Sequence, residues 1–135
     1  MASVYRGQDL TLGRPVAIKI LEADLAADGA FRTRFRLEAQ SASRMSHPAI
    51  VRVYDAGEET RTDAAGNPHP EPYIVMELVT GRLLKDIIAE GPVPLEDALR
   101  YTDGILEALE YSHRAGVVHR DIKPGNVMVT DAGQV

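Results

Sequence analysis

The chain contains 135 residues, of which 44% are hydrophobic and 26% are charged, proportions that are typical of a globular protein. Its formal net charge of −5 gives no electrostatic support for general nucleic-acid binding. It contains no cysteine, which excludes disulfide bonds and thiolate metal sites and is consistent with a reducing cytoplasm. The longest apolar run, residues 73–79, is too short to cross a bilayer, and residues 1–6 lack the apolar stretch of a signal peptide. We therefore expect a cytoplasmic chain, or the cytoplasmic part of a longer, membrane-anchored protein.

The first 20 residues have the pattern of two β-strands, and residues 15–21 form the second of them. The twofold period of a strand places Ala17, Lys19 and Leu21 on one face of it. A lysine between a small alanine and a leucine suits a face that covers a ligand with phosphate groups. The alternative is a lysine that protects a sheet edge from pairing, and the strand alone favours this alternative.

Residues 28–45 predict a helix, because apolar side chains recur at helical spacing. Glu38 lies three residues after Phe35 and four before Ala42, so we expect its carboxylate to lean toward the buried side. An unpaired buried charge is unfavourable, and Lys19 is the partner that we expect for it. The arginines of this helix are interpreted as a solvated face rather than a binding patch: Arg32, Arg34, Arg36 and Arg44.

Proline at position 48 ends this helix, and two further strands are predicted over residues 50–56 and 73–79. The residues between them, 57–72, are rich in Thr, Asp, Gly and Pro and predict a long polar surface loop. His69 in this loop is interpreted as a loop histidine and not as a ligand.

After residue 80 the composition becomes helical. A short amphipathic helix is predicted around residues 83–88, and a longer one extends from Pro94 to Gly116. The chain therefore divides near residue 80, with residues 1–79 and 80–135 as its predicted domains. The expected fold class is α+β, with a strand-rich part followed by a helical part.

Residues 119–126, His-Arg-Asp-Ile-Lys-Pro-Gly-Asn, follow the longer helix. Their spacing is that of the catalytic loop H-R-D-x-x-x-x-N. Phosphoryl transfer needs a carboxylate that orients and deprotonates the attacking hydroxyl, a cation beside the transferred group, and an oxygen ligand for magnesium. Asp121, Lys123 and Asn126 supply these groups in that order. The alternative is a polar surface loop between a helix and a strand.

With this loop, the chain resembles the bacterial eukaryotic-like Ser/Thr protein kinases, in particular the actinobacterial receptor-type kinases. Residues 16–19, Val-Ala-Ile-Lys, resemble the lysine motif of that family's third strand, and Glu38 resembles its helix-C glutamate. The segments 47–51, 73–77 and 111–126 match further motifs in the family's order. The resemblance covers the whole chain. It implies a kinase fold, with an antiparallel N-lobe sheet plus helix C, a hinge, and the first part of a helical C-lobe.

The resemblance also implies roles in phosphoryl transfer from ATP, with Mg²⁺ or Mn²⁺, to protein Ser and Thr hydroxyls. Lys19 would hold the α- and β-phosphates and pair with Glu38. Asp121 would be the catalytic base, Lys123 would neutralise the γ-phosphoryl group, and Asn126 would bind the metal. The residues implied around the adenine are Val4 and Ala17 above it, Met128 below it, Met76 as gatekeeper, and the backbone of Glu77 and Val79 at its edge.

The chain departs from the family pattern near both ends. Residues 1–3 hold only the last part of the Gly-rich loop, and residues 131–135 stop before the expected Asp-Phe-Gly. Thr80 stands where close relatives often carry an acidic residue near the ribose. We therefore expect a partial kinase domain with an open sheet edge over residues 3–9 and a partly uncovered apolar stripe along 94–116. The isolated polypeptide is expected to be poorly stable and to have little or no kinase activity.

Three functions are consistent with these residues. The first is a Ser/Thr protein kinase that acts on protein substrates, with a second kinase chain as a further partner and no nucleic acid. The second is a truncated, non-catalytic kinase that serves as an interaction module. The third is a small-molecule phosphotransferase, which ranks behind because Arg120 and Lys123, together with His47-Pro48, favour the protein-kinase branch. Lys123, two residues after Asp121, favours Ser/Thr over Tyr specificity.

Overall fold

The computed structural model describes residues 2–135, which divide into two compact units. Unit 1 contains the residues up to Arg44 together with Arg52–Leu78, and unit 2 contains Met45–Val51 together with Val79–Val135. The main division thus falls between Leu78 and Val79, close to the predicted boundary. The short segment Met45–Val51, which the sequence pattern places in the first part, belongs to unit 2.

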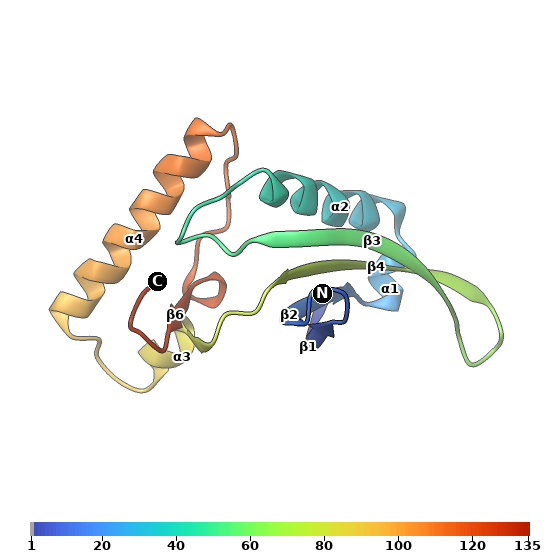
Figure 1. Cartoon of the computed structure of the whole chain (residues 1–135), viewed down its shortest axis with the longest axis horizontal. Helices are drawn as coiled ribbons and strands as arrows, with labels where there is room; N and C mark the ends of the chain where they lie inside the picture. The colour runs from blue at the N-terminus through green and yellow to red at the C-terminus, as the bar shows by residue number, and fades with distance from the viewer. Residues whose placement is uncertain (1) are drawn as a thin grey trace. The chain divides into compact units, whose positions relative to one another are not determined.

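Unit 1 is built on an antiparallel sheet in the order β1-β2-β4-β3 (Figure 1). The strands are β1 (Ala2–Asp9), β2 (Arg14–Leu21), β3 (Val53–Thr62) and β4 (Pro68–Glu77). Two helices follow β2, namely α1 (Ala23–Ala26) and α2 (Gly29–Ser43). Asp28 caps α2, because its Oδ1 accepts a hydrogen bond from the backbone N–H of Ala30 at 2.9 Å.

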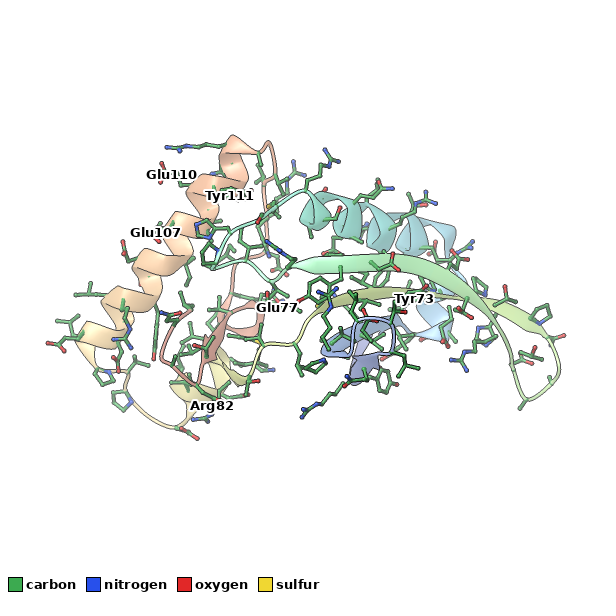
Figure 2. The ribbon with its side chains drawn as sticks, viewed as in Figure 1. Tyr73, Glu77, Arg82, Glu107, Glu110 and Tyr111 are labelled. Carbon is green, nitrogen blue, oxygen red and sulfur yellow. The ribbon has the colours of Figure 1, made fainter. Side chains whose placement is uncertain are left out.

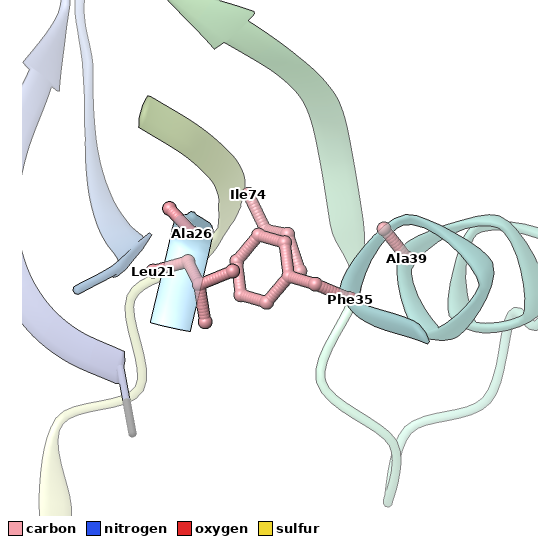
Figure 3. Close-up of a cluster of buried hydrophobic side chains, with 5 residues drawn as sticks. All are labelled: Leu21, Ala26, Phe35, Ala39 and Ile74. Atoms are coloured by element: carbon pink, nitrogen blue, oxygen red, sulfur yellow. The ribbon is translucent and has the colours of Figure 1, made fainter. Parts of the chain in front are cut away.

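The core of unit 1 lies between α2 and the sheet (Figure 3). Phe35 and Ala39 are one helical turn apart on α2, so both point to the same side of the helix. They pack with Leu21 from β2, Ala26 from α1 and Ile74 from β4. Burial of this apolar cluster is what attaches α2 to the sheet.

The predicted loop over residues 57–72 is wrong, because most of it is strand. The turn of the β3–β4 hairpin is confined to the residues between Thr62 and Pro68. Within that turn, Asp63 Oδ1 accepts hydrogen bonds from the backbone N–H groups of Ala65 at 3.0 Å and Asn67 at 2.8 Å. The outer part of the β3–β4 hairpin carries polar side chains and extends into solvent. Its strands pair through backbone hydrogen bonds and do not need the apolar alternation of a half-buried strand.

Unit 2 contains a small antiparallel pair of strands, β5 (Gly81–Leu83) and β6 (Met128–Thr130). Between them lie the helices α3 (Leu84–Ala89) and α4 (Leu95–Arg114) and the 3₁₀ turn η1 (Pro124–Asn126). Tyr111 of α4 holds the segment Met45–Val51, because its hydroxyl accepts a hydrogen bond from Ser46 N at 2.9 Å and its ring lies 5.2 Å from that of His47. These contacts explain why that segment belongs to unit 2.

Helix α4 exposes part of its apolar surface, as the sequence predicts. Tyr101 and Ser112 are buried, whereas Leu95, Leu99 and Leu106 are 73%, 62% and 58% exposed. An antiparallel sheet followed by helices confirms the α+β class. No helix among residues 2–135 is both long enough and apolar enough to span a membrane.

Candidate active-site residues in the two units

The cross-strand register of unit 1 gathers four of the predicted nucleotide-binding residues on one face of its sheet. Val4 pairs with Lys19 across β1 and β2, and Ala17 pairs with Met76 across β2 and β4. Directly paired residues of antiparallel strands project from the same face, and successive alternate residues continue it. Val4 is 63% exposed and Ala17 only 8%. Lys19 therefore shares this face with the apolar side chains of Val4, Ala17 and Met76.

Lys19 does not pair with Glu38. No ion pair joins them among residues 2–135, and Glu38 is exposed. Lys19 Nζ instead lies 6.0 Å from the centroid of the Phe35 ring, at the limit of a cation–π contact. The expectation that Glu38 leans toward the buried side is wrong.

The physical reason is the narrow buried stripe of α2. Phe35 and Ala39 are the buried residues of this helix, so the stripe is centred between them. At 100° per residue, the Glu38 side chain projects about 80° away from that centre, at the edge of the stripe. A spacing of three from Phe35 and four from Ala42 therefore leaves room for the carboxylate to turn to solvent.

Glu77 ends β4 in a fixed position (Figure 2). Its backbone N–H donates to the carbonyl of Arg52 at 2.8 Å, and its Oε1 accepts from the Arg52 N–H at 3.2 Å. The next predicted adenine contact, Val79, is half-buried and is assigned to unit 2.

The predicted catalytic loop, residues 119–126 of unit 2, begins with an unusual backbone. Arg120 has φ of 69°, a left-handed conformation that non-glycine residues seldom adopt. The following residue, Asp121, donates its N–H to His119 Nδ1 at 3.1 Å. Through this hydrogen bond, His119 supports the backbone of the loop. Strained backbone of this kind persists where surrounding contacts hold it, and such positions are frequent at functional sites.

Asp121, Lys123 and Asn126 converge in this loop, as the sequence predicts. Asn126 Nδ2 donates to the backbone carbonyl of Asp121 at 2.9 Å and lies 3.4 Å from its Oδ2. Lys123 Nζ lies 3.3 Å from the same Oδ2. The side chains of Asp121 and Lys123 are 64% and 58% exposed, so an incoming group can reach both.

The loop is anchored by contacts that sequence motifs do not reveal. The N–H of Leu84, the first residue of α3, donates to the carbonyl of Val127 at 2.8 Å, and Met128 pairs with Leu83. A Cβ atom at Gly81 would collide with the carbonyl oxygen of Val129, so glycine there allows β5 and β6 to approach. These hydrogen bonds depend on the complete fold, so a sequence motif could not predict them.

The residues present fit a magnesium nucleotide in part. Because the amide nitrogen of Asn126 is used toward Asp121, its amide oxygen is the atom left to ligate a cation. Mg²⁺ prefers oxygen ligands and keeps several water or phosphate oxygens in its shell, so one protein ligand in an open loop suits it. Residues 2–135 contain no cluster of three or more His, Cys, Asp or Glu side chains that could hold a metal by themselves.

Comparisons with known proteins match this chain to protein kinases. The family model for the protein kinase domain matches residues 1–135. A probable serine/threonine-protein kinase of Streptomyces coelicolor is 56% identical over 136 residues, which cover 100% of this chain and 20% of that protein. The serine/threonine-protein kinase PknB of Mycobacterium tuberculosis is 47% identical over 136 residues, with coverages of 100% and 21%.

Solved structures give the same result for the fold. The crystal structure of the Mycobacterium tuberculosis PknI kinase domain matches with a TM-score of 0.78 and 31% sequence identity. The match covers 98% of this chain and 51% of that one. The chain therefore has the protein-kinase fold, with an antiparallel sheet and the helices that follow it. It spans about a fifth of the length of the curated relatives that it matches.

Proposed function

The chain belongs to the protein kinase domain family, and from that premise we propose that it takes part in phosphoryl transfer from MgATP to Ser and Thr hydroxyls of proteins. The observation that carries the proposal is the convergence of Asp121, Lys123 and Asn126 in one exposed loop. It joins a base, a cation and a metal-ligating oxygen, the set that this reaction needs. The divalent cation, when bound, neutralises charge on the phosphate oxygens.

Asp121 is proposed as the base that orients and deprotonates the attacking hydroxyl. Its backbone is held from both sides, by His119 through its N–H and by Asn126 through its carbonyl. The carboxylate remains exposed and carries Lys123 beside it, which is proposed to move to the transferred phosphoryl group. A fixed backbone and a carboxylate that an incoming hydroxyl can reach are the conditions for a positioned general base.

The sheet face of unit 1 is proposed to bind the nucleotide. Lys19 would contact the α- and β-phosphates, and Val4 and Ala17 would cover the adenine, with Met76 beside it. Four further residues complete the proposed nucleotide set, namely Glu38 as the helix-C carboxylate, the backbone of Glu77 and Val79 at the adenine edge, and Met128 below the ring. In the structure described, Glu38 would have to turn inward to meet Lys19.

The partners and the location of the protein are also proposals. Protein substrates are those expected of the family, whereas pairing of two kinase chains and a cytoplasmic location stay predictions. The similar proteins are named as kinases, and this does not favour the alternative of a non-catalytic interaction module.

The test is a transfer assay with the gene product that contains this chain. Replacement of Asp121 with Asn (Asp121→Asn) is expected to lower transfer of labelled phosphate from ATP to a Ser/Thr substrate by about 10²–10⁴-fold, the usual contribution of a general base. The matched control is Asp103→Asn, at an exposed position of α4. Equal rates for the wild-type protein and Asp121→Asn would refute the proposal.

A further inference from the structure

Lys85 is an exposed cation of unit 2 that lies against the predicted catalytic loop. It is the second residue of α3, and Figure 1 shows this helix beside β6, the strand that follows the loop. Lys85 Cδ lies 3.7 Å from the position that a Cβ atom would take at Gly125, an ordinary van der Waals distance. The aliphatic part of Lys85 therefore packs on Gly125, and the ammonium group, two bonds beyond Cδ, is left at the surface.

No acidic side chain pairs with Lys85 within the part of the chain that the structure describes. Arg82, three residues earlier, is by contrast paired with Glu90. Asp86 follows Lys85 on α3, but consecutive residues of a helix do not face each other. The charge of Lys85 is therefore available to a ligand that approaches the loop.

The contact with Gly125 determines how far Lys85 lies from the proposed base. Asn126 Nδ2 donates a hydrogen bond to the carbonyl of Asp121 at 2.9 Å, and Gly125 is the residue before Asn126. Neighbouring Cα atoms are about 3.8 Å apart, so Gly125 lies on the order of 10 Å from the Asp121 carboxylate. An extended peptide rises about 3.3 Å per residue. A side chain about three positions from the phosphorylated residue of a substrate would therefore come opposite Lys85.

The loop and Lys85 together carry an excess of positive charge. The loop contains two cations, Arg120 and Lys123, and a single carboxylate, that of Asp121. Lys85 adds a third cation, although the chain as a whole has a net charge of −5. Lys123 is engaged with Asp121 and is proposed to serve the phosphoryl group, and Arg120 precedes Asp121 at the other end of the loop from Gly125. Lys85 is thus the cation placed for a neighbouring side chain of the substrate.

We infer that Lys85 is a specificity-determining residue for the protein substrate, and that it selects a Glu or Asp residue about three positions from the phosphorylated Ser or Thr. The inference rests on the proposed function, because it concerns the substrate of the same loop. The Lys85 ammonium group binds the carboxylate of the substrate beside Gly125. Lysine suits this role, because its ammonium group is a compact charge with three donors on a flexible chain.

The probe is a peptide library with a central Thr, in which each flanking position in turn is fixed as Glu, Gln or Lys while the others are mixed. The gene product that contains this chain transfers labelled phosphate from ATP at library concentrations below KM, so the initial rates report kcat/KM. We expect Glu to exceed Gln by about two- to fivefold at a position about three residues from Thr, the range of an exposed ion pair. In Lys85→Gln this ratio should fall to about one, and in Lys85→Glu the same position should favour Lys.

The matched control variant is Arg114→Gln. It removes the same charge from unit 2 at an exposed position of α4, where Arg114 is paired with Glu110, and the ratio of Glu to Gln should remain that of the wild type. With the best Glu-containing peptide, Lys85→Gln should raise KM more than it lowers kcat, because the contact is made equally to the bound substrate and to the transition state. A purely structural role of Lys85 beside Gly125 would instead lower kcat equally with Glu and Gln peptides.

Several results would overturn the inference and leave the proposed function intact. These are equal rates with Glu and Gln at every position, the same preference in the wild type and in Lys85→Gln, or equal weakening in Lys85→Gln and Arg114→Gln. A second measurement needs no variant, because added salt screens an exposed ion pair and should bring the ratio of Glu to Gln toward one. A ratio that is insensitive to salt would also overturn the inference. An absence of transfer to every peptide would instead refute the proposed function, and this inference with it.

Discussion

Asn126 is expected to serve the proposed reaction with both ends of its amide. The nitrogen holds the backbone carbonyl of Asp121 at 2.9 Å, and the oxygen is the atom proposed to ligate magnesium. The residue thus links the position of the base to the position of the metal. A change at Asn126 is expected to affect two separable quantities, the rate of transfer and its dependence on magnesium concentration.

We predict that Asn126→Ala lowers the transfer rate and raises the magnesium concentration needed for half-maximal rate, because both contacts are lost. Asn126→Asp keeps an oxygen ligand but places a carboxylate beside that of Asp121. It should therefore restore the magnesium dependence more than the rate. A magnesium titration of the transfer rate in the gene product separates these effects. If Asn126→Ala changed the rate with no change in magnesium dependence, the metal role would be excluded.

Single residues in this loop could be predicted from the sequence because their spacing is local. Asp121, Lys123 and Asn126 lie within one short turn, so any fold that forms the turn brings them together. Glu38 and Lys19 are on different elements, and their pairing depends on how α2 rotates against the sheet. Spacing along the helix does not determine that rotation when the buried stripe is narrow, and the predicted pair is not formed.

At the scale of elements, α3 is tied to β5 by a surface ion pair. Arg82 donates two hydrogen bonds to Glu90, at 2.8 and 2.5 Å (Figure 2 labels Arg82). These hydrogen bonds hold the pKa of Glu90 below its ordinary value of 4.5, and the positive charge of Arg82 makes a second, smaller contribution in the same direction. The same bonds and the charge of Glu90 raise the pKa of Arg82. Both side chains are exposed, so salt weakens the pair.

We predict that Arg82→Gln raises the pKa of Glu90 toward 4.5. A carboxyl whose pKa is lowered in the folded state stabilises that state above its unfolded pKa. This contribution is lost as the pH falls through the lowered folded value. The wild-type protein should therefore lose this small contribution below pH 4.5, and the variant should show no such loss. Titration of Glu90 by NMR measures the shift directly. In the control variant Arg100→Gln, which removes an ion pair to Asp97 on α4, the Glu90 titration should stay as in the wild type.

For the whole molecule, the sequence predicts the order of elements better than their membership of the two units. The strands around Lys19 and Met76 and the helices after residue 80 have periodic patterns that determine their type locally. The segment Met45–Val51 has no such pattern, and it joins unit 2 through contacts of Ser46 and His47 with Tyr111. Ser46 and Tyr111 are 65 residues apart in the sequence, so local periodicity cannot predict their contact.

The exposed stripe of α4 governs how the isolated polypeptide is expected to behave. Leu95, Leu99 and Leu106 project within about 40° of one another around the helix, so they form one apolar stripe. Aligned exposed leucines favour association with another apolar surface. The buried Tyr101 lies on the other side of the helix, so the stripe is not needed to attach α4 within unit 2.

We predict that the 135-residue polypeptide self-associates and that Leu99→Glu/Leu106→Glu reduces this association, as measured by sedimentation velocity. Helix content should be unchanged, because glutamate is a good helix former and both sites are more than half exposed. The comparison variant is Leu109→Glu, at a half-buried position of the same helix, where a buried carboxylate should lower the melting temperature instead. Loss of helix in the double variant would mean that the stripe is covered in solution. Unchanged association with helix intact would place the associating surface elsewhere, with the exposed Leu10 and Leu12 of the β1–β2 turn as the next residues to replace.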